Sequence, residues 1–207
     1  RALWMLEEIG LPRELKMLPF PPRVLKPEYL GVNPLGTIPL LIDGESRLTE
    51  SAAICQYLAV KHSPRALNVE PDESGFADYL NFLHFGEATL TFPQTLLLRY
   101  GQFEPPERRQ PQVVEDYGKW FLARLRTLEP RLEASPFLAA GRFTAADVSV
   151  GYALMLAEVL KLDKRFTPAV AAYWQRLQQR AAFQSALRVQ SQAAKEQGVP
   201  TGLPVDA

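Results

Sequence analysis

The sequence contains little cysteine and little histidine, and neither sign of charge is in excess. Cys55 is the single cysteine among 207 residues, so no disulfide can form within the chain, and this usage is typical of a reducing compartment. Lys and Arg together number 23, as do Asp and Glu, so the basic excess of a nucleic-acid-binding protein is missing. His62 and His84 have no cysteine at ligand spacing, and we predict no metal site.

Long apolar runs are missing as well. No run approaches the roughly 18 residues that a transmembrane helix needs, and no basic segment precedes an apolar core as it does in a signal peptide. The composition, 47% apolar and 22% charged residues, is that of a folded globular protein. We therefore expect a cytoplasmic protein without membrane or nucleic-acid partners. Helical spacing begins at Arg1 itself, so we also expect that native residues precede it.

The first 64 residues have the pattern of a small α/β unit. The predicted elements are, in order, a helix over 1–9 that Gly10 ends, a short strand within 13–20, one helical turn before Pro34, a hairpin whose turn is Asp43-Gly44, and a helix over 51–61. Mixed elements of this kind favour a sheet covered by helices. Residues 65–75 are rich in turn formers and predict a linker.

Residues 76–207 predict an all-helical second domain. Helical spacing covers 76–101, with a kink at Pro93, and then 112–134, 145–161, 169–181 and 183–194. At the start of the third of these helices, Thr144 and Asp147 have the spacing of a capping box. Because a capping box is a structural feature, Asp147 is not a candidate catalytic base.

A proline interrupts the apolar segment TIPLLID. Because proline cannot donate to a β-ladder, Pro39 belongs at an edge, at a strand start or at a cis turn. A cis Ile38-Pro39 bond would leave the N–H and C=O of Ile38 unpaired within its own sheet, and such groups need a partner. An extended peptide ligand can supply one by pairing as an added strand. A plain turn is the alternative interpretation of Pro39.

Glu50 and Ser51 lie where the hairpin ends and the next helix begins. Free N–H groups and the positive end of the helix dipole favour an anion at such a terminus. Ser51 is therefore a candidate to bind a ligand carboxylate through its N–H and its hydroxyl, and Glu50 is a candidate to hold an ammonium group. A peptide backbone at Ile38 and an amino-acid zwitterion at Ser51 together fit a γ-glutamyl peptide. The alternative is that Ser51 is only an N-cap.

These motifs occur in the order of a known family. The segments NPLGTIPLL, the Asp-Gly hairpin and LTESAAICQYL resemble the thioredoxin-like domain of the cytosolic glutathione transferases, bacterial types among them. The segment RALWMLEEIGLP is similar to the first helix of that domain, and FTAADVSVG to the capping box and staple of the helical domain. The resemblance implies a βαβαββα domain, whose first strand would precede Arg1, followed by an all-α domain, normally in a homodimer.

The resemblance also implies which residues bind glutathione as co-substrate. Ile38 would pair with the cysteinyl backbone, Pro39 would be the cis-proline, and Glu50 and Ser51 would hold the γ-glutamyl end. Thr37 departs from the pattern, because many bacterial relatives have lysine there, near the glycyl carboxylate.

The residue that activates the thiol is not among these. In the family a Ser, Tyr or Cys at the end of the first strand stabilises the thiolate, and here that strand would precede Arg1. The resemblance implies transfer of glutathione to an electrophilic apolar molecule. The alternatives are a glutathione-dependent isomerase, dehalogenase or disulfide reductase, and a non-catalytic binding or regulatory module. Cysteine at the activating position would favour reduction, and serine or tyrosine the other chemistries.

The helical pattern over 76–101 is rich in Phe and Leu, and the resemblance places the small hydrophobic electrophile against it. The candidate pocket residues are Phe85, Thr89 and Phe92, with plain core packing as the alternative. Cys55 lies within another apolar helical pattern, which predicts a buried core residue rather than a nucleophile.

Overall fold

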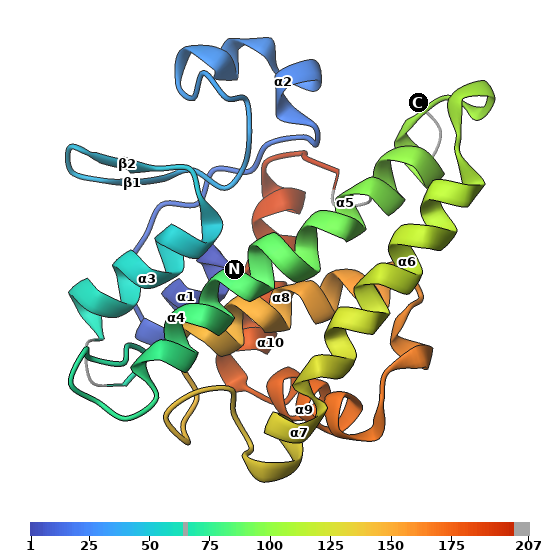
Figure 1. The fold of residues 1–207 in the computed structure, drawn as a ribbon. Coiled ribbons are helices and arrows are strands. Elements are labelled where there is room, and N and C mark those ends of the chain that lie inside the picture. The colour runs from blue at the N-terminus through green and yellow to red at the C-terminus, as the bar shows by residue number, and fades with distance from the viewer. Residues whose placement is uncertain (64–65, 201–207) are drawn as a thin grey trace.

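A computed structural model of the chain describes residues 1–63 and 66–200. A lobe of short elements is followed by a bundle of helices (Figure 1). The lobe contains α1 (Ala2–Ile9), α2 (Pro22–Leu25), a 3₁₀ turn (Pro27–Gly31), β1 (Leu41–Asp43), β2 (Ser46–Leu48) and α3 (Ser51–His62). The bundle contains α4 (Phe76–His84), α5 (Phe92–Leu98), α6 (Pro111–Leu125), α7 (Glu129–Ala134), α8 (Ala145–Val159), α9 (Pro168–Gln178) and α10 (Ala181–Glu196).

The start and the hairpin of the lobe agree with the sequence patterns. Gly10 ends α1 in the left-handed conformation (φ 74°), and its N–H donates to the carbonyl of Leu6. Strands β1 and β2 pair antiparallel, with Leu41 opposite Leu48. Gly44 in the connecting turn has a φ of 60°, which glycine adopts without steric cost. The predicted helix cap and hairpin are therefore confirmed, but the loop is Gly44-Glu45 rather than the predicted Asp43-Gly44, because Asp43 is still paired, opposite Ser46.

The strand predicted within 13–20 is not a strand in the structure. Residues 11–19 pair with no strand of the described chain, whose sheet consists of β1 and β2. Instead, the N–H of Met17 donates to Gln197 Oε1 (2.9 Å), and Gln197 Nε2 donates to the carbonyl of Leu15 (2.8 Å). The prediction was wrong because side-chain alternation describes one segment, whereas a strand also requires a neighbouring backbone.

The segment predicted as one helix over 76–101 is helical in the structure, and it is interrupted by two π-helical turns. A π-helical turn, Phe85–Thr91, joins α4 to α5, and a second one, Arg99–Phe103, follows α5. Pro93 has no N–H and cannot close a helical hydrogen bond. The first π-helical turn ends at Thr91, just before Phe92 and Pro93. Because Pro93 cannot donate a hydrogen bond to the preceding turn, the helix widens there.

The later helices match their predicted ranges, except that the first is divided. A 3₁₀ turn, Arg126–Leu128, separates α6 from α7 within the range predicted as one helix. Two further 3₁₀ turns, Pro106–Arg108 and Asp163–Arg165, lie between helices. None of the helices in the described ranges combines the length and apolar character that crossing a membrane requires. The division into domains of residues 1–64 and 76–207 with a linker between them stays a prediction.

The capping box at the start of α8 is present. The N–H of Thr144 donates to Asp147 Oδ2 (2.8 Å), and the reciprocal contact completes the box. Asp147 is fully buried and also accepts hydrogen bonds from the Leu138 N–H (3.1 Å) and the Tyr173 hydroxyl (2.8 Å). Burial raises the pKa of Asp147 to about 6, although these hydrogen bonds oppose the shift. The structural interpretation of Asp147 is therefore confirmed.

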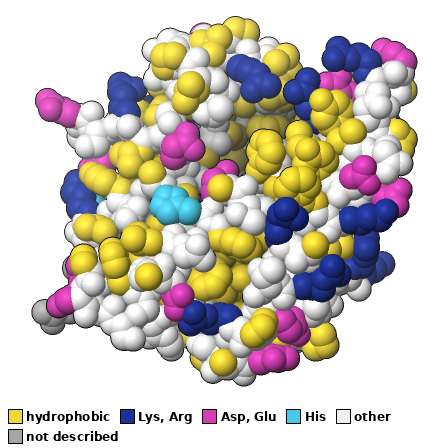
Figure 2. All heavy atoms as spheres, in the orientation of Figure 1, with side chains coloured by type: hydrophobic (Ala, Val, Ile, Leu, Met, Phe, Trp, Pro, Cys, Tyr) yellow, Lys and Arg dark blue, Asp and Glu magenta, His cyan; other side chains and the backbone are white. Residues whose placement is uncertain are grey.

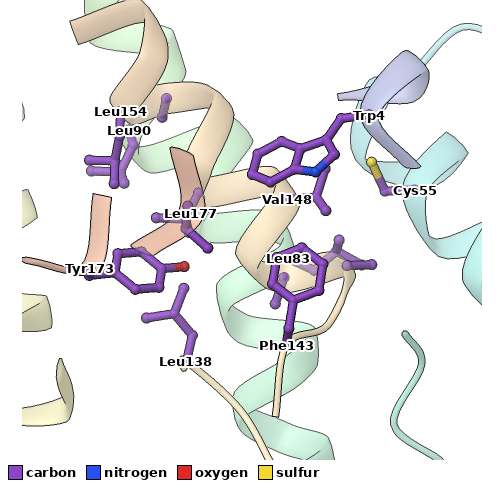
Figure 3. Close-up of a cluster of buried hydrophobic side chains, with 14 of the residues drawn as sticks. Trp4, Cys55, Leu83, Leu90, Leu138, Phe143, Val148, Leu154, Tyr173 and Leu177 are labelled. Carbon is purple, nitrogen blue, oxygen red and sulfur yellow. The ribbon is translucent and has the colours of Figure 1, made fainter. Parts of the chain in front are cut away.

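One buried core connects the lobe to the bundle (Figure 3). Trp4 of α1 packs edge-on against Phe183, with ring centroids 4.8 Å apart, and lies 6.0 Å from the ring of Phe143. Gly151 of α8 permits this packing, because a Cβ there would lie 2.8 Å from the Trp4 ring. The position of α1, and of the site residues around it, is thus fixed by the helical bundle.

Candidate functional site

Two side chains hold the backbone just before the cis-proline. The Tyr29 hydroxyl (2.9 Å) and Asn33 Nδ2 (2.9 Å) both donate to the carbonyl oxygen of Thr37, whose side chain is exposed. Tyr29 and Asn33 are themselves buried. The Ile38-Pro39 peptide that follows is cis, as the sequence predicts. The two hydrogen bonds therefore fix the direction in which the chain enters this peptide.

The backbone of Ile38 is open to a ligand. Ile38 is 41% exposed, and neither its N–H nor its C=O forms a hydrogen bond with any residue of the described ranges. An unpaired donor and acceptor beside an ordered turn is the arrangement that strand addition uses. The openness predicted for this backbone is present, and its occupation by a peptide stays a prediction.

Glu50 and Ser51 have different surroundings. Glu50 is the N-cap residue of α3, with an extended backbone, an exposed side chain and no cap hydrogen bond. Ser51 is half-buried, and its hydroxyl donates to Glu87 Oε2 (3.2 Å) and accepts from Arg1 Nη1 (3.0 Å). The first-turn N–H groups of α3 begin at these residues and provide the positive end of the helix dipole. The helix N-terminus predicted at Ser51 is therefore present, and its binding of an anion stays a prediction.

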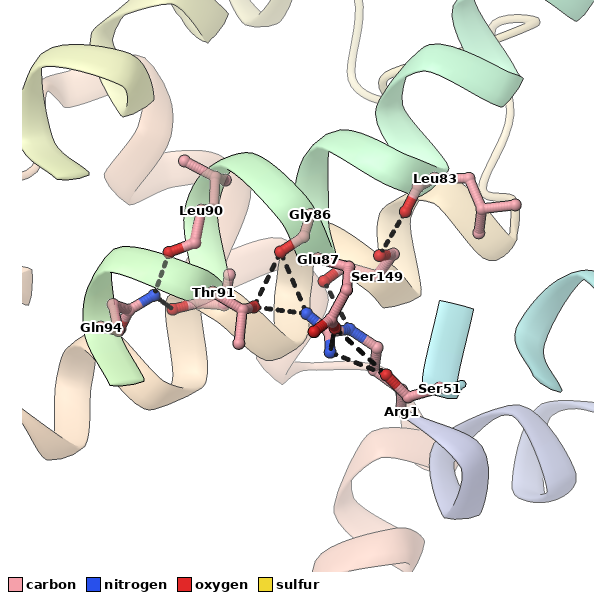
Figure 4. Close-up of polar contacts among 10 residues, drawn as sticks. Arg1, Ser51, Leu83, Gly86, Glu87, Leu90, Thr91, Gln94 and Ser149 are labelled. Atoms are coloured by element: carbon pink, nitrogen blue, oxygen red, sulfur yellow. Dashed lines mark hydrogen bonds and ion pairs between the residues drawn. The ribbon is translucent and has the colours of Figure 1, made fainter. Parts of the chain in front are cut away.

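Arg1 is the centre of a buried polar network beside Ser51 (Figure 4). Its side chain is only 3% exposed, and all five of its N–H donors are used. The acceptors are Ser149 O (3.2 Å) for Nε, Ser51 Oγ and the Glu87 carboxylate for Nη1, and Gly86 O (3.0 Å) and the Thr91 hydroxyl for Nη2. The guanidinium also lies over the Tyr152 ring, 4.3 Å from its centroid. The network therefore joins α1, α3, the first π-helical turn and α8.

The charge within this network is balanced. Burial lowers the pKa of Arg1, and the Glu87 carboxylate opposes that shift. A guanidinium remains charged at this burial because its pKa is ordinarily above 12. Glu87 is partly exposed, with 39% of its side chain accessible. A carboxylate thus reaches the surface next to Ser51, while the compensating cation stays buried.

Two of the three predicted pocket residues line one surface cavity. Phe85 and Thr89 line a surface cavity of about 390 Å³ whose other walls also come from α4 and its π-helical turn. Phe92, further along, is 58% exposed. On the same π-helical turn, Glu87 and Thr91 instead contact Arg1. The structure therefore brings Phe85 and Thr89 to one cavity, whose lining residues do not include Ser51, and the pocket stays a prediction.

Comparison with known proteins decides the family. A profile described as "Glutathione S-transferase, N-terminal domain" matches residues 1–61. The chain is 36% identical over 168 residues to glutathione S-transferase 3 of Schizosaccharomyces pombe, covering 76% of this chain and 69% of that protein. It is 33% identical over 190 residues to glutathione S-transferase 4 of Zea mays, covering 88% and 83%. The chain belongs to the glutathione S-transferase family.

A solved structure of the family has the same fold. Glutathione transferase URE2P6 from Phanerochaete chrysosporium, in complex with oxidized glutathione, superposes with a TM-score of 0.81 at 28% identity, over 93% of this chain and 90% of that one. The predicted fold class, a thioredoxin-like domain followed by an all-helical domain, is therefore confirmed for this transferase-family chain. URE2P5 of the same fungus has been cocrystallized with 1-(S-glutathionyl)-2,4-dinitrobenzene (TM-score 0.79, 25% identity, 94% and 90% coverage).

Four residues of the site were not predicted from the sequence of this transferase. Arg1 and Glu87 reach Ser51 from residues 50 and 36 positions away, and such contacts have no local pattern. Glu87 did carry one signal, because it is an acid in the middle of the largely apolar range 76–101. Tyr29 and Asn33 belong to the turn that precedes the cis-proline, which indicates their location but not their shared bond to Thr37.

Cys55 is a core residue. It is fully buried in α3, and burial raises the pKa of its thiol to about 11. A thiol in this state is largely protonated at neutral pH and is a poor nucleophile. The prediction that Cys55 packs in the core is confirmed.

Proposed function

We propose that this protein is a glutathione transferase, which binds glutathione between Ile38 and the start of α3 and joins its thiolate to a small hydrophobic electrophile. The observation that carries the proposal is the pairing of an open backbone beside the cis-proline with a helix N-terminus at Ser51, in a chain of this family. Glutathione offers a peptide backbone to the first and an amino-acid carboxylate to the second.

The backbone side of the proposed site selects a peptide. Ile38 presents one donor and one acceptor with no competing partner in the described chain, and the bonds to the Thr37 carbonyl order the turn before ligand arrives. Because little ordering is required on binding, less conformational entropy is lost. Thr37 itself offers no positive charge, so its side chain could give a glycyl carboxylate at this end only a hydrogen bond from its hydroxyl.

The helix side selects the γ-glutamyl end. Its carboxylate would accept hydrogen bonds from the N–H groups that open α3, aided by the helix dipole. Its ammonium group would lie near a carboxylate, and the chain offers Glu50, the predicted partner, and Glu87, which contacts the Ser51 hydroxyl. We propose, on the family resemblance, that the group activating the thiol lies in a first strand before Arg1; Cys55, which is buried in the core, is not that group.

Retention on immobilised glutathione tests this site with a matched control. The Glu50→Ala, Ser51→Ala double variant removes the acid–serine pair at α3, and the Glu45→Ala, Ser46→Ala variant removes an exposed pair of the same composition in the hairpin. We expect the first variant to lose retention and the second to bind like the wild type, with melting temperatures recorded for both. Equal retention of the first variant and the wild type would overturn the site assignment.

The reaction and the assembly need separate measurements. Conjugation assays with a panel of electrophiles should give turnover, whereas binding without turnover on any of them would favour the regulatory module. We also propose, on the family resemblance, that the protein is a cytoplasmic homodimer. Sedimentation equilibrium should then give twice the chain mass of 23.3 kDa, and a single chain mass would contradict the dimer.

A further inference from the structure

The peptide group between Thr37 and Ile38 is hydrogen-bonded at one end and open at the other. Its carbonyl oxygen, that of Thr37, accepts from the Tyr29 hydroxyl (2.9 Å) and from Asn33 Nδ2 (2.9 Å). Its N–H, that of Ile38, forms no hydrogen bond within residues 1–63 and 66–200. Because a carbonyl oxygen has two lone pairs, the protein saturates the carbonyl end of this peptide group and leaves the N–H end for a ligand.

Both donors to this carbonyl are buried and ordered by the protein itself. Tyr29 lies in the 3₁₀ turn and is 7% exposed, and Asn33 is 2% exposed. The side-chain oxygen of Asn33 accepts from the N–H of Leu35 (3.1 Å), and this bond defines which way the amide faces, with Nδ2 toward Thr37. The backbone N–H of Asn33 donates to the carbonyl of Tyr29 (2.9 Å). The two donors therefore support each other.

The turn that leads to this peptide group packs closely within the lobe. Gly36 has a φ of 61°, and a Cβ there would lie 2.6 Å from the Cβ of Arg23 in α2 and 2.9 Å from the Leu30 side chain, so the close approach requires glycine. The N–H of Gly36 donates to the carbonyl of Asn33 (2.8 Å). Figure 2 shows a hollow in the surface beneath the upper part of the lobe, where α2 lies in the orientation of Figure 1. The backbone is thus held up to the peptide group whose N–H is free.

Hydrogen bonds to the oxygen of an amide make its N–H a better donor, because resonance joins the two ends of the group. Bonds that form such a chain strengthen one another by roughly 10–30% each. Two buried donors act on the Thr37 carbonyl, in surroundings where water does not weaken their effect. The Ile38 N–H is therefore a stronger donor than that of an amide whose carbonyl accepts no hydrogen bond.

We propose that Tyr29 and Asn33 are positioning residues for peptide binding, which act through the Thr37 carbonyl to orient and polarise the Ile38 N–H toward a carbonyl oxygen of the ligand. The inference rests on the proposed function, because that ligand is taken to be glutathione. Both side chains are buried and act without touching it. They therefore determine the affinity for the peptide backbone, whichever electrophile reacts.

Binding of S-methylglutathione, an unreactive thioether of the peptide, tests this role without requiring turnover. Dissociation constants are measured by calorimetry with the full chain. Tyr29→Phe removes one donor and keeps the ring, and Asn33→Asp replaces the other donor by an acceptor of nearly the same shape. Tyr57→Phe is the matched control, because its hydroxyl donates elsewhere in the lobe, to Asp43 (2.8 Å). We expect the first two variants to weaken binding about three- to tenfold, the range implied by one hydrogen bond, and Tyr57→Phe to stay within about twofold.

A pH profile and amide resonances distinguish positioning from a general loss of structure. In Asn33→Asp, protonation of the introduced carboxyl restores a donor to the Thr37 carbonyl, so lowering the pH from about 8 to about 5 should recover part of the lost affinity relative to the wild type. In proton–nitrogen spectra without ligand, the Ile38 amide proton should move upfield in Tyr29→Phe and in Asn33→Asp at the higher pH. The amide proton of Ile42, in β1, should not move.

Two results would overturn the inference alone, namely wild type that binds S-methylglutathione no more tightly than both variants, and weakened variants whose Ile38 resonance is unmoved. If neither variant folds, the wild type decides. A Thr37 carbonyl carbon that resonates downfield, as two accepted hydrogen bonds imply, supports the inference, and an ordinary position would overturn it. Wild type that does not bind S-methylglutathione at all would overturn the proposed function and this inference with it.

Discussion

Replacing Arg1 by alanine should destabilise the fold by about 3–5 kcal/mol, because the hydrogen bonds and the ring contact of a buried guanidinium are lost. The structure supports this figure from its individual contacts. Five hydrogen bonds are lost, but several acceptors keep another partner; Gly86 O, for example, still accepts from the Thr91 hydroxyl (2.7 Å). The free-energy cost of losing each hydrogen bond is therefore at the lower end of the usual range, about 0.5–1 kcal/mol. Loss of the contact with the Tyr152 ring adds about 1 kcal/mol.

Urea unfolding of the full-length protein, followed by circular dichroism, measures this free energy. Arg1→Lys should lose about half as much, because an ammonium group has three donors where the guanidinium has five. Arg47→Ala is the matched control, since Arg47 is exposed and forms one hydrogen bond of 3.4 Å, to Val32 O; its effect should stay below about 0.5 kcal/mol. A loss below about 1 kcal/mol for Arg1→Ala would refute the view that this network holds the lobe to the bundle.

Three further predictions concern the buried core. A Cβ on Gly86 would lie 2.5 Å from the Ser149 carbonyl carbon, so Gly86→Ala should cost about 1–3 kcal/mol in urea unfolding, whereas Gly31→Ala, with no atom within 4 Å, should be nearly neutral. The raised pKa of Asp147, about 6 against an ordinary 3.8, means that the folded state binds this proton more tightly than the unfolded state, so stability should increase as the pH falls from about 6 to about 4. Asp147→Asn should remove that increase and cost about 2–3 kcal/mol at neutral pH; an unaltered pH profile would contradict the assignment. Cys55 should resist iodoacetamide in the native protein and react after unfolding, as mass spectrometry would record.

Features fixed by neighbours in the sequence were predicted well. The capping box at Thr144, the glycine that ends α1 and the Asp-Gly hairpin each depend on residues within a few positions of one another. The strand within 13–20 failed because its status depends on a second backbone, and the described chain offers the Gln197 side chain instead. The π-helical turn before Pro93 was expected only as a kink, since a sequence shows that a donor is missing but not how the helix widens around it.

In the candidate site, too, the sequence predicts a residue, whereas a distant partner determines which of its atoms can bind a ligand. Ser51 was predicted to offer a ligand carboxylate both its N–H and its hydroxyl. A serine hydroxyl has one proton to donate, and in the structure it is donated to Glu87, while Arg1 occupies one acceptor position. A ligand carboxylate at α3 therefore has the backbone N–H groups and the helix dipole available, and the hydroxyl orients Glu87 beside them. The sequence identifies the residue, but a partner 36 positions away determines which of its atoms remain free to bind.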